Sequence, residues 1–352
     1  MTFAYSSRIL IIGPSWIGDM VMAQSLFITL HRLNPGITLD VLAPRWSRPL
    51  LQRMPQVFDA IDMPVGHGAL DLGKRYKLAK SLRSRRYRQA IVLPNSFKSA
   101  LIPWFAGIPL RTGWRGEMRY GVINDLRRLD KRKYPLLVQR FNALAYPKGT
   151  ALPAEQPTPL LQTNRHNASS LLKRFSLNTD RKVLALCPGA EFGSAKRWSA
   201  RHYAAVARSR IEKGWQIWLL GSDKDRDIAK AIAGMLTKEE RSLCKVLAGV
   251  TELAQAIDLL ALADAVVSND SGLMHICAAL RKPLVVVYGS TSPGFTPPLY
   301  EGATVISNPV DCGPCFRREC PKGHTECLDN LLPDQVIHAL EAELYAKVIL
   351  HP

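Results

Sequence analysis

The chain alternates short apolar runs with amphipathic stretches, and this alternation stops once, near the middle, before it begins again. Each apolar run is bounded by glycine or proline and has the length of a strand, whereas the amphipathic stretches have the 3.6-residue period of helices. Such alternation is typical of a parallel sheet covered by helices on both faces. With 352 residues the chain is also long enough for two cores. The sequence therefore predicts an α/β fold that is built twice.

In the first half we expect strands near 8–13, 37–43, 57–62 and 89–94, and helices near 19–33, 71–86, 97–106 and 134–146. In the second half we expect strands near 182–187, 215–221, 264–268 and 284–288, and helices near 199–213, 223–235, 252–262 and 271–280. The pattern of a last helix, 333–348, assigns it to neither half, so that it either stays with the second or packs back on the first.

The alternation stops over 147–160, a stretch rich in proline and without periodicity, which is typical of a linker. We therefore predict a first domain over 1–160 and a second over 161–352. Two doubly wound domains that face each other hold a ligand in the cleft between them, at the carboxyl ends of their strands.

The charge of the chain is unevenly distributed. The formal net charge is +18, and residues 1–160 hold 24 Lys and Arg against 9 Asp and Glu. The excess is densest at 74–88 and at 127–133. A basic face attracts nucleic acid, anionic lipid or a phosphorylated substrate, and the alternative is a solvated helix flank. No helix-turn-helix, zinc-finger or RNP pattern accompanies these charges, so we do not expect nucleic acid as the partner.

No stretch of the sequence approaches the roughly 20 apolar residues that span a bilayer. The apolar run at 9–12 is also too short for the core of a signal peptide. We therefore expect a cytoplasmic protein.

The first expected strand leads into Gly13-Pro-Ser-Trp-Ile-Gly-Asp-Met20. Glycines between a strand and a helix are typical of phosphate-binding loops, but the Lys-Ser/Thr pair of a P-loop and the third glycine of a dinucleotide fingerprint are missing. Asp19 instead places a carboxylate at a helix N-terminus, where the helix dipole favours its ionised form. Such a residue is either a helix N-cap or a general base that accepts a proton from a hydroxyl nucleophile.

A loop of the second half, Cys187-Pro-Gly-Ala-Glu-Phe-Gly-Ser-Ala-Lys-Arg-Trp198, combines glycine with positive charge. Gly189 allows backbone to approach a ligand, and Lys196 and Arg197 supply charge beside it. This combination suits a diphosphate, and the alternative is a loop with exposed basic residues.

The next loop of this kind separates the expected strand 264–268 from the expected helix 271–280. The N–H groups at the start of that helix form an anion site, and Ser271 and Gly272 lie at it. Asp270 is placed to orient a sugar hydroxyl. His275 lies one turn into the helix, where it either contacts a phosphate or is a buried histidine satisfied by backbone.

Four of the seven cysteines lie within one short segment, which also contains His324. They are Cys312, Cys315, Cys320 and Cys327. Four thiols and an imidazole suit a structural zinc site, but the C-x₂-C pair lacks a second C-x₂-C. Reduced or redox-labile thiols are the alternative, since a cytoplasmic protein is not expected to form disulfides.

Nearly from end to end, the chain resembles the ADP-heptose:lipopolysaccharide heptosyltransferases (glycosyltransferase family 9), and most of all the members that add the second heptose of the inner core. The motifs that carry the resemblance are Gly13-Pro-Ser-Trp-Ile-Gly-Asp-Met20, Leu93-Pro-Asn-Ser-Phe-Lys-Ser-Ala-Leu101, Arg111-Thr-Gly-Trp-Arg-Gly-Glu-Met-Arg-Tyr-Gly121, Pro188-Gly-Ala-Glu-Phe-Gly-Ser-Ala-Lys-Arg-Trp198 and Asn269-Asp-Ser-Gly-Leu-Met-His275. The cysteine segment resembles one found in many members of the family, though not in all.

The resemblance implies a GT-B fold of two Rossmann-like domains and an inverting transfer from ADP-heptose that needs no metal for catalysis. Asp19 matches the proposed general base, and Lys196 matches a lysine that contacts the donor phosphate. The donor-binding loop is matched by Asp270, Ser271, Gly272 and His275, with Gly189 in the loop before it. Asp225, which follows an expected strand, is a further candidate for the ribose hydroxyls.

The resemblance also implies an acceptor that is phosphorylated and lipid-linked, so we expect a peripheral protein on the cytoplasmic face of the inner membrane. Candidates for contacts to acceptor anions are Lys98, Arg111, Arg115 and Arg119. The alternatives are transfer of the first heptose to Kdo, and another nucleotide-sugar transferase or epimerase of the same fold.

Overall fold

The computed structural model of the chain describes residues 7–66 and 68–350. The chain divides into two compact units, Met1–Pro159 and Leu160–Pro352. This division lies one residue from the one predicted after residue 160. Within the described residues, each unit contains one six-stranded sheet.

The sheet of the first unit runs in the order β3-β2-β1-β4-β5-β6, and all its strand pairs are parallel. This is the strand order of a Rossmann fold. Its strands are β1 (Arg8–Ile12), β2 (Thr38–Pro44), β3 (Val57–Met63), β4 (Gln89–Val92), β5 (Leu110–Trp114) and β6 (Asp125–Arg127). Its helices are α1 (Ile17–Leu33), α2 (Arg48–Leu51), α3 (Leu72–Leu82), α4 (Phe97–Phe105) and α5 (Leu137–Asn142).

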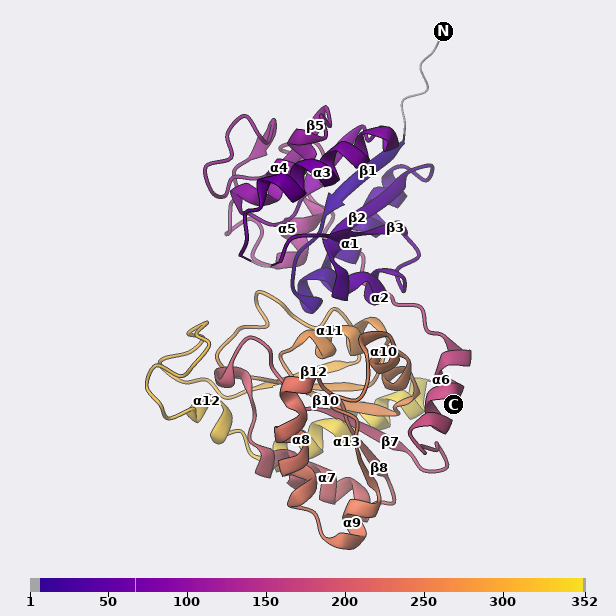
Figure 1. The fold of residues 1–352 in the computed structure, drawn as a ribbon. Helices are drawn as coiled ribbons and strands as arrows, with labels where there is room; N and C mark the ends of the chain where they lie inside the picture. Colours follow the sequence, from indigo (N-terminus) through magenta and orange to yellow (C-terminus); the bar gives the residue numbers. More distant parts are fainter. Residues whose placement is uncertain (1–6, 67, 351–352) are drawn as a thin grey trace. The chain divides into compact units, whose positions relative to one another are not determined.

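The core of the first unit explains why these helices cover the sheet. The central strands β1 and β4 are buried along almost their whole length, as expected for a parallel sheet with both faces covered. Helices α3 and α4 lie side by side (Figure 1) and share a core cluster with β1, β2 and β4. Helix α1 packs against α5.

The sheet of the second unit runs in the order β12-β11-β10-β7-β8-β9, which repeats the order of the first when the strands are renumbered along the chain. Its strands are β7 (Val183–Cys187), β8 (Gln216–Leu219), β9 (Cys244–Val246), β10 (Ala265–Asn269), β11 (Leu284–Tyr288) and β12 (Ala303–Ser307). Its helices are α6 (Arg165–Arg174), α7 (Ala200–Glu212), α8 (Arg226–Gly234), α9 (Lys238–Ser242), α10 (Leu253–Leu262), α11 (Gly272–Ala279), α12 (Glu326–Asp329) and α13 (Pro333–Leu350).

The last helix belongs to the second unit, because α13 packs against α7 and against strands β10, β11 and β12. Val336 and Leu340 of α13 lie in the same core cluster as Trp198 and Tyr203. Among the residues that the structure describes, no helix is both long and apolar enough to cross a bilayer.

The α/β fold with two parallel sheets is confirmed. The strands missing from the sequence prediction are β5, β6, β9 and β12, which lie toward the edges of their sheets. Strands β6 and β9 have three residues each, β12 is only half-buried, and polar Arg111 and Thr112 interrupt β5, so these sequences lack the continuous apolar run that marks β1 or β11.

Candidate active site

Each sheet has one place where the strand order reverses, and the loops there carry most of the candidate residues. The reversal lies between β1 and β4 in the first unit, and between β7 and β10 in the second. Ligands of open parallel sheets bind outside the carboxyl ends of the strands at such a point. Asp19 follows β1 and Lys98 follows β4, whereas Lys196 follows β7 and Asp270 follows β10.

In the second unit, Asn269 at the end of β10 holds both ends of the loop after β7. Its side-chain oxygen accepts hydrogen bonds from the backbone N–H of Trp198 at 3.2 Å and from the Tyr203 hydroxyl at 3.0 Å. Its amide nitrogen donates to the Pro188 carbonyl at 2.6 Å. Asn269 is fully buried, so these bonds fix the loop in place. The candidate list from the sequence missed this residue, although its place in a matched motif was a signal.

Lys196 and Asp270 form the central ion pair of this site. The ammonium Nζ of Lys196 lies 2.5 Å from Oδ2 of Asp270 and 3.4 Å from the Asp270 carbonyl. The same carboxylate oxygen accepts a 2.5 Å hydrogen bond from the Thr291 hydroxyl. Two of the three N–H donors of Lys196 are thus directed at Asp270, and the third can be directed at a ligand oxygen. No sequence pattern marks Thr291 as a site residue.

Helix α11 begins beside this ion pair. Its N-cap is Ser271, whose side chain makes no capping hydrogen bond, and its first residue is Gly272. Both residues are half-buried, so the N-terminus of the helix can receive an anion. His275 is buried, and burial lowers its pKa to about 4, with Asp270 opposing the shift and Lys196 adding to it. At neutral pH its imidazole is therefore uncharged.

Asp225 lies beneath the loop after β7. Its Oδ2 accepts from the backbone N–H and the hydroxyl of Ser222, at 2.9 and 2.7 Å, and Arg197 approaches its Oδ1 at 4.0 Å. A Cβ on Gly189 would stand 2.3 Å from the Asp225 carboxyl carbon, so only glycine allows this approach. The carboxylate joins two loops, and a contact with a ribose hydroxyl stays a prediction.

In the first unit, Asp19 is the third residue of α1. The N-cap of that helix is Trp16, so the alternative in which Asp19 is the N-cap is wrong. Asp19 is half-buried, and the helix dipole favours its ionised form there. The loop after β4 lies at the same edge of the sheet, because β1 and β4 are neighbours.

Arg119 is placed differently from the sequence prediction. It is fully buried, and its guanidinium donates to the carbonyls of Pro94 at 2.7 Å and of Trp114 at 2.5 Å, and to Oδ1 of Asn95 at 3.2 Å. Burial lowers its pKa to about 10, with Glu117 opposing the shift. The expected contact with acceptor anions is therefore wrong for Arg119, whose charge stabilises the loop after β4.

Arg111 is also engaged by backbone. Its guanidinium donates to the carbonyls of Val122 at 2.6 Å and of Ile108 at 2.5 Å, so it holds the segment before β6 rather than a ligand. Arg115 is exposed and lies 5.8 Å from the ring centre of Tyr120. Lys98 is half-buried in the first turn of α4. The structure thus leaves Arg115 and Lys98 as the candidates for acceptor anions.

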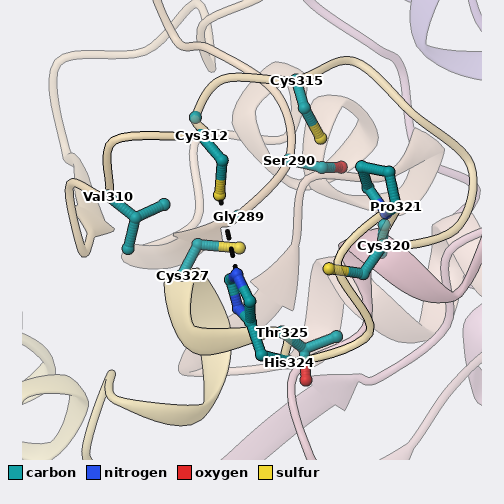
Figure 2. Close-up of a pocket in the computed structure, with 12 residues that line it drawn as sticks. Gly289, Ser290, Val310, Cys312, Cys315, Cys320, Pro321, His324, Thr325 and Cys327 are labelled. Atoms are coloured by element: carbon teal, nitrogen blue, oxygen red, sulfur yellow. Dashed lines mark hydrogen bonds between the residues drawn. The ribbon is translucent and has the colours of Figure 1, made fainter.

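The four cysteines of the segment 312–327 gather around a small pocket together with His324 (Figure 2). The pocket encloses about 20 Å³, and Sγ of Cys312 lies 3.9 Å from Nε2 of His324. Backbone N–H groups, first of all that of Thr325, lower the pKa of Cys320. All four thiols are free.

These side chains do not form a metal-ligating group as they stand. In the part of the chain that the structure describes, no three His, Cys, Asp or Glu side chains are placed to hold a metal ion. A zinc ion in this segment therefore stays a prediction, and it would require the thiols to move closer together.

The cysteine segment supports the loop that carries Lys196. The Ala195 N–H donates to the Arg318 carbonyl at 3.0 Å, and a Cβ on Gly193 would stand 2.1 Å from that same oxygen. The Phe316 N–H donates to the Ser290 carbonyl at 2.7 Å, next to Thr291. The segment thus lies against both loops that hold the Lys196–Asp270 pair.

Comparison with known proteins identifies relatives along nearly the whole chain. Glycosyltransferase family 9 (heptosyltransferase) matches residues 75–326. Lipopolysaccharide heptosyltransferase 2 of Escherichia coli K12 is 51% identical over 342 residues, which cover 96% of this chain and 98% of the relative. Lipopolysaccharide heptosyltransferase 1 of Pseudomonas aeruginosa PAO1 is 26% identical, over 97% of this chain and 99% of the relative.

A solved structure described as ADP-heptose lps heptosyltransferase II of E. coli superposes with a TM-score of 0.88. It is 48% identical in sequence, and the match covers 97% of this chain and 99% of that one.

Proposed function

This chain belongs to glycosyltransferase family 9, the heptosyltransferases, and we propose that it transfers heptose from ADP-heptose to the heptose already present on the lipopolysaccharide inner core. The observation that carries the proposal is a difference in sequence identity. The chain is 51% identical to a heptosyltransferase 2 over nearly its full length, but 26% and 32% identical to two heptosyltransferases 1. Transfer of the second heptose is therefore favoured over transfer of the first to Kdo.

The second unit binds the donor in this proposal. The diphosphate of ADP-heptose accepts hydrogen bonds from the N–H groups at the start of α11, from the Ser271 hydroxyl and from the third N–H of Lys196. Asp270 holds the ammonium of Lys196 at 2.5 Å, and the Thr291 hydroxyl donates to the same carboxylate oxygen, so both contacts fix the direction of the ion pair. When ADP leaves, the charge that develops on the diphosphate meets donors that are already oriented.

The first unit supplies the general base. The acceptor hydroxyl attacks the anomeric carbon of the heptose, the bond from that carbon to the diphosphate oxygen breaks, and Asp19 takes the hydroxyl proton. Attack from the face opposite the leaving group inverts the anomeric configuration. General base catalysis of this kind contributes about 10²–10⁴ in rate. The position of Asp19 in the first turn of α1, at the same sheet edge as the loop after β4, supports this role.

The acceptor carries phosphate, so cations near Asp19 favour its binding. Arg115 and Lys98, which follow β5 and β4, are the residues to which we assign these contacts. Since Lys196 and α11 stabilise the leaving diphosphate, the transfer is expected to proceed without a divalent cation. An anionic lipid surface is the place where a lipid-linked acceptor is met, and the basic first unit is attracted to such a surface.

An assay of ADP release tests the proposal. Purified protein receives ADP-heptose together with Kdo₂-lipid A, either with or without a first heptose, and each reaction is run with and without EDTA. We expect ADP release only with the mono-heptosylated acceptor, and at the same rate with and without EDTA. Release with the acceptor that lacks heptose would assign the chain to the first transfer, and strong inhibition by EDTA would contradict transfer without a metal.

A further inference from the structure

One surface of the first unit combines positive charge with exposed aromatic side chains. Over residues 72–116 the sequence contains eleven Lys and Arg and not one Asp or Glu. This stretch includes α3 and α4, which lie side by side on the sheet (Figure 1). Both helices turn apolar residues toward the core cluster of the first unit, so their other faces point away from it.

The outward face of α3 is defined by a stripe at helical spacing. Leu72, Tyr76 and Lys80 follow one another at intervals of four residues and therefore lie on one side of the helix. All three are exposed, whereas Ala79 and Leu82 are buried, so the stripe runs along the edge of the helix face that packs on the core.

The end of α4 continues this stripe. The ring of Phe105 contacts Tyr76 edge-on, with centroids 5.6 Å apart, and the tilted ring of Trp104 at 5.1 Å. Arg83 donates to the Phe105 carbonyl at 2.8 Å, which ties the end of α3 to the end of α4. Leu72, Tyr76 and Trp104 are 50%, 49% and 46% exposed, so a large part of each apolar side chain still faces water.

Two observations point to the partner of this surface, which we define as Leu72, Tyr76, Lys77, Lys80 and Trp104. Tryptophan and tyrosine next to lysine are typical of helices that lie in the interface of a membrane. The charged residues of this surface, Lys77 and Lys80, are both cations, whereas the flanking Asp71 and Glu117 are engaged by Lys74 and by the Phe97 N–H. The surface is therefore complementary to anionic headgroups.

We propose that this α3–α4 surface docks the first unit on a bilayer of anionic lipid, with Leu72, Tyr76 and Trp104 inserted among the headgroups and Lys77 and Lys80 above them. Docking would bring the first unit to a lipid-linked acceptor and confine its search to two dimensions. This inference deepens the proposed function, on which it rests only for the nature of the acceptor.

Vesicle binding tests the surface directly. We expect the wild-type chain to sediment with vesicles of phosphatidylglycerol and phosphatidylcholine, and much less with phosphatidylcholine alone. Because each basic residue near an anionic surface contributes about 1 kcal/mol, Lys77→Glu/Lys80→Glu should weaken partitioning at least about thirtyfold. Trp104→Ala should weaken it about fivefold, since about half of the side chain is free to insert.

Matched controls separate this surface from general charge and hydrophobicity. Lys173→Glu/Lys230→Glu makes the same change on exposed helices of the second unit, and Trp46→Ala removes another exposed tryptophan of the first. Both controls should partition like the wild type. Equal losses in the controls and in the surface variants would overturn the proposal.

Activity provides a second measurement. With the acceptor embedded in anionic vesicles, Lys77→Glu/Lys80→Glu should release ADP at least about tenfold more slowly than the wild type, and with a deacylated acceptor free in solution at the same rate. Slowing with both acceptors would place these lysines in the site and overturn the docking role. A wild-type chain that binds vesicles but transfers heptose to neither acceptor would support the surface and contradict the proposed function.

Two other partners are outcomes of the same experiments. If the wild-type chain bound RNA as tightly as vesicles, and Lys77→Glu/Lys80→Glu abolished both, the surface would be a nucleic-acid site and the proposal would fail. If sedimentation showed a dimer that Trp104→Ala dissociates, the apolar stripe would be covered by a second copy of the chain, which would equally overturn it.

Discussion

The two units share one strand order, yet a buried cation stabilises a strand-end loop in the first unit, whereas buried side-chain oxygens do so in the second. In the first, the buried cation of Arg119 donates to carbonyls of the loop after β4. In the second, the buried acceptors Asn269 and Asp225 receive backbone N–H groups from the loops after β7 and β8. The sheet thus determines where the loops lie, and the side chains within them determine what they offer a ligand. In our proposal the first unit removes a proton and the second receives the leaving diphosphate.

The sharpest test of this division is Asp19→Asn. An amide cannot accept the hydroxyl proton, so we expect kcat to fall about 10²–10⁴-fold while the affinity for ADP stays unchanged. The measurements are the rate of ADP release at saturating substrates and calorimetric titration with ADP. A matched control is Asp227→Asn, which changes an exposed aspartate in the first turn of α8. A loss of ADP affinity in Asp19→Asn would mean that the first unit also binds the donor.

Arg119→Met tests whether the first unit depends on its buried cation. Methionine fills part of the volume but leaves the carbonyls of Pro94 and Trp114 buried without donors, which costs about 2–4 kcal/mol of unfolding free energy. Urea unfolding measures this loss, and Arg128→Met, at an exposed position in the same unit, should show almost none. A stable Arg119→Met variant with a raised KM for the acceptor would restore Arg119 as a binding residue.

Lys196→Met tests the second unit in the same way as Asp19→Asn tests the first. A hydrogen bond to a charged group contributes about 1.5–3 kcal/mol, so the Kd for ADP should rise about 10–10²-fold. Calorimetric titration measures the change, with Lys230→Met as the control at an exposed lysine of α8. If Lys196→Met bound ADP normally and lost only kcat, Lys196 would act on the departing diphosphate in the transition state alone.

The sequence predicted the sites where glycine and charge interrupt strong apolar periodicity. The central strands could be predicted because each is a continuous apolar run, and Asp19, Lys196 and Asp270 could be predicted because each follows such a run. Residues that act through tertiary contacts could not be predicted in this way. Thr291 is 21 residues from the aspartate it contacts, and no local pattern relates the two.

The arginines of the segment 111–119 also show that sequence alone does not determine tertiary contacts. A sequence gives the charge of Arg111, Arg115 and Arg119 but not their surroundings, and all three were predicted to contact acceptor anions. In the structure Arg119 is enclosed by carbonyls, Arg111 holds a turn and Arg115 is exposed. The three arginines differ in role because they differ in burial. Their burial depends on how the segment after β5 folds against the loop after β4.

The smallest effect concerns His275, which lies beside the ion pair of the second unit. Burial lowers its pKa to about 4, against about 6.5 in the unfolded chain. Between pH 4 and pH 6.5 the imidazole is protonated in the unfolded state but not in the folded state. The free energy of unfolding is therefore highest above pH 6.5 and falls as the pH drops through this window. The contribution of His275 changes the free energy of unfolding by at most about 1.4 kcal/mol per pH unit.

His275→Gln should remove this slope. From urea unfolding at pH 7.5 and 5.5, we expect the wild type to lose about 1.4 kcal/mol more than the variant, whereas His166→Gln, at an exposed position of α6, should lose as much as the wild type. Because a neutral imidazole adds no charge, the pH dependence of ADP affinity should come from the terminal phosphate of ADP alone and be the same in both proteins. An affinity that rises below pH 6.5 in the wild type alone would mean that bound diphosphate recharges His275, and the second unit would then hold two cations for its ligand rather than one.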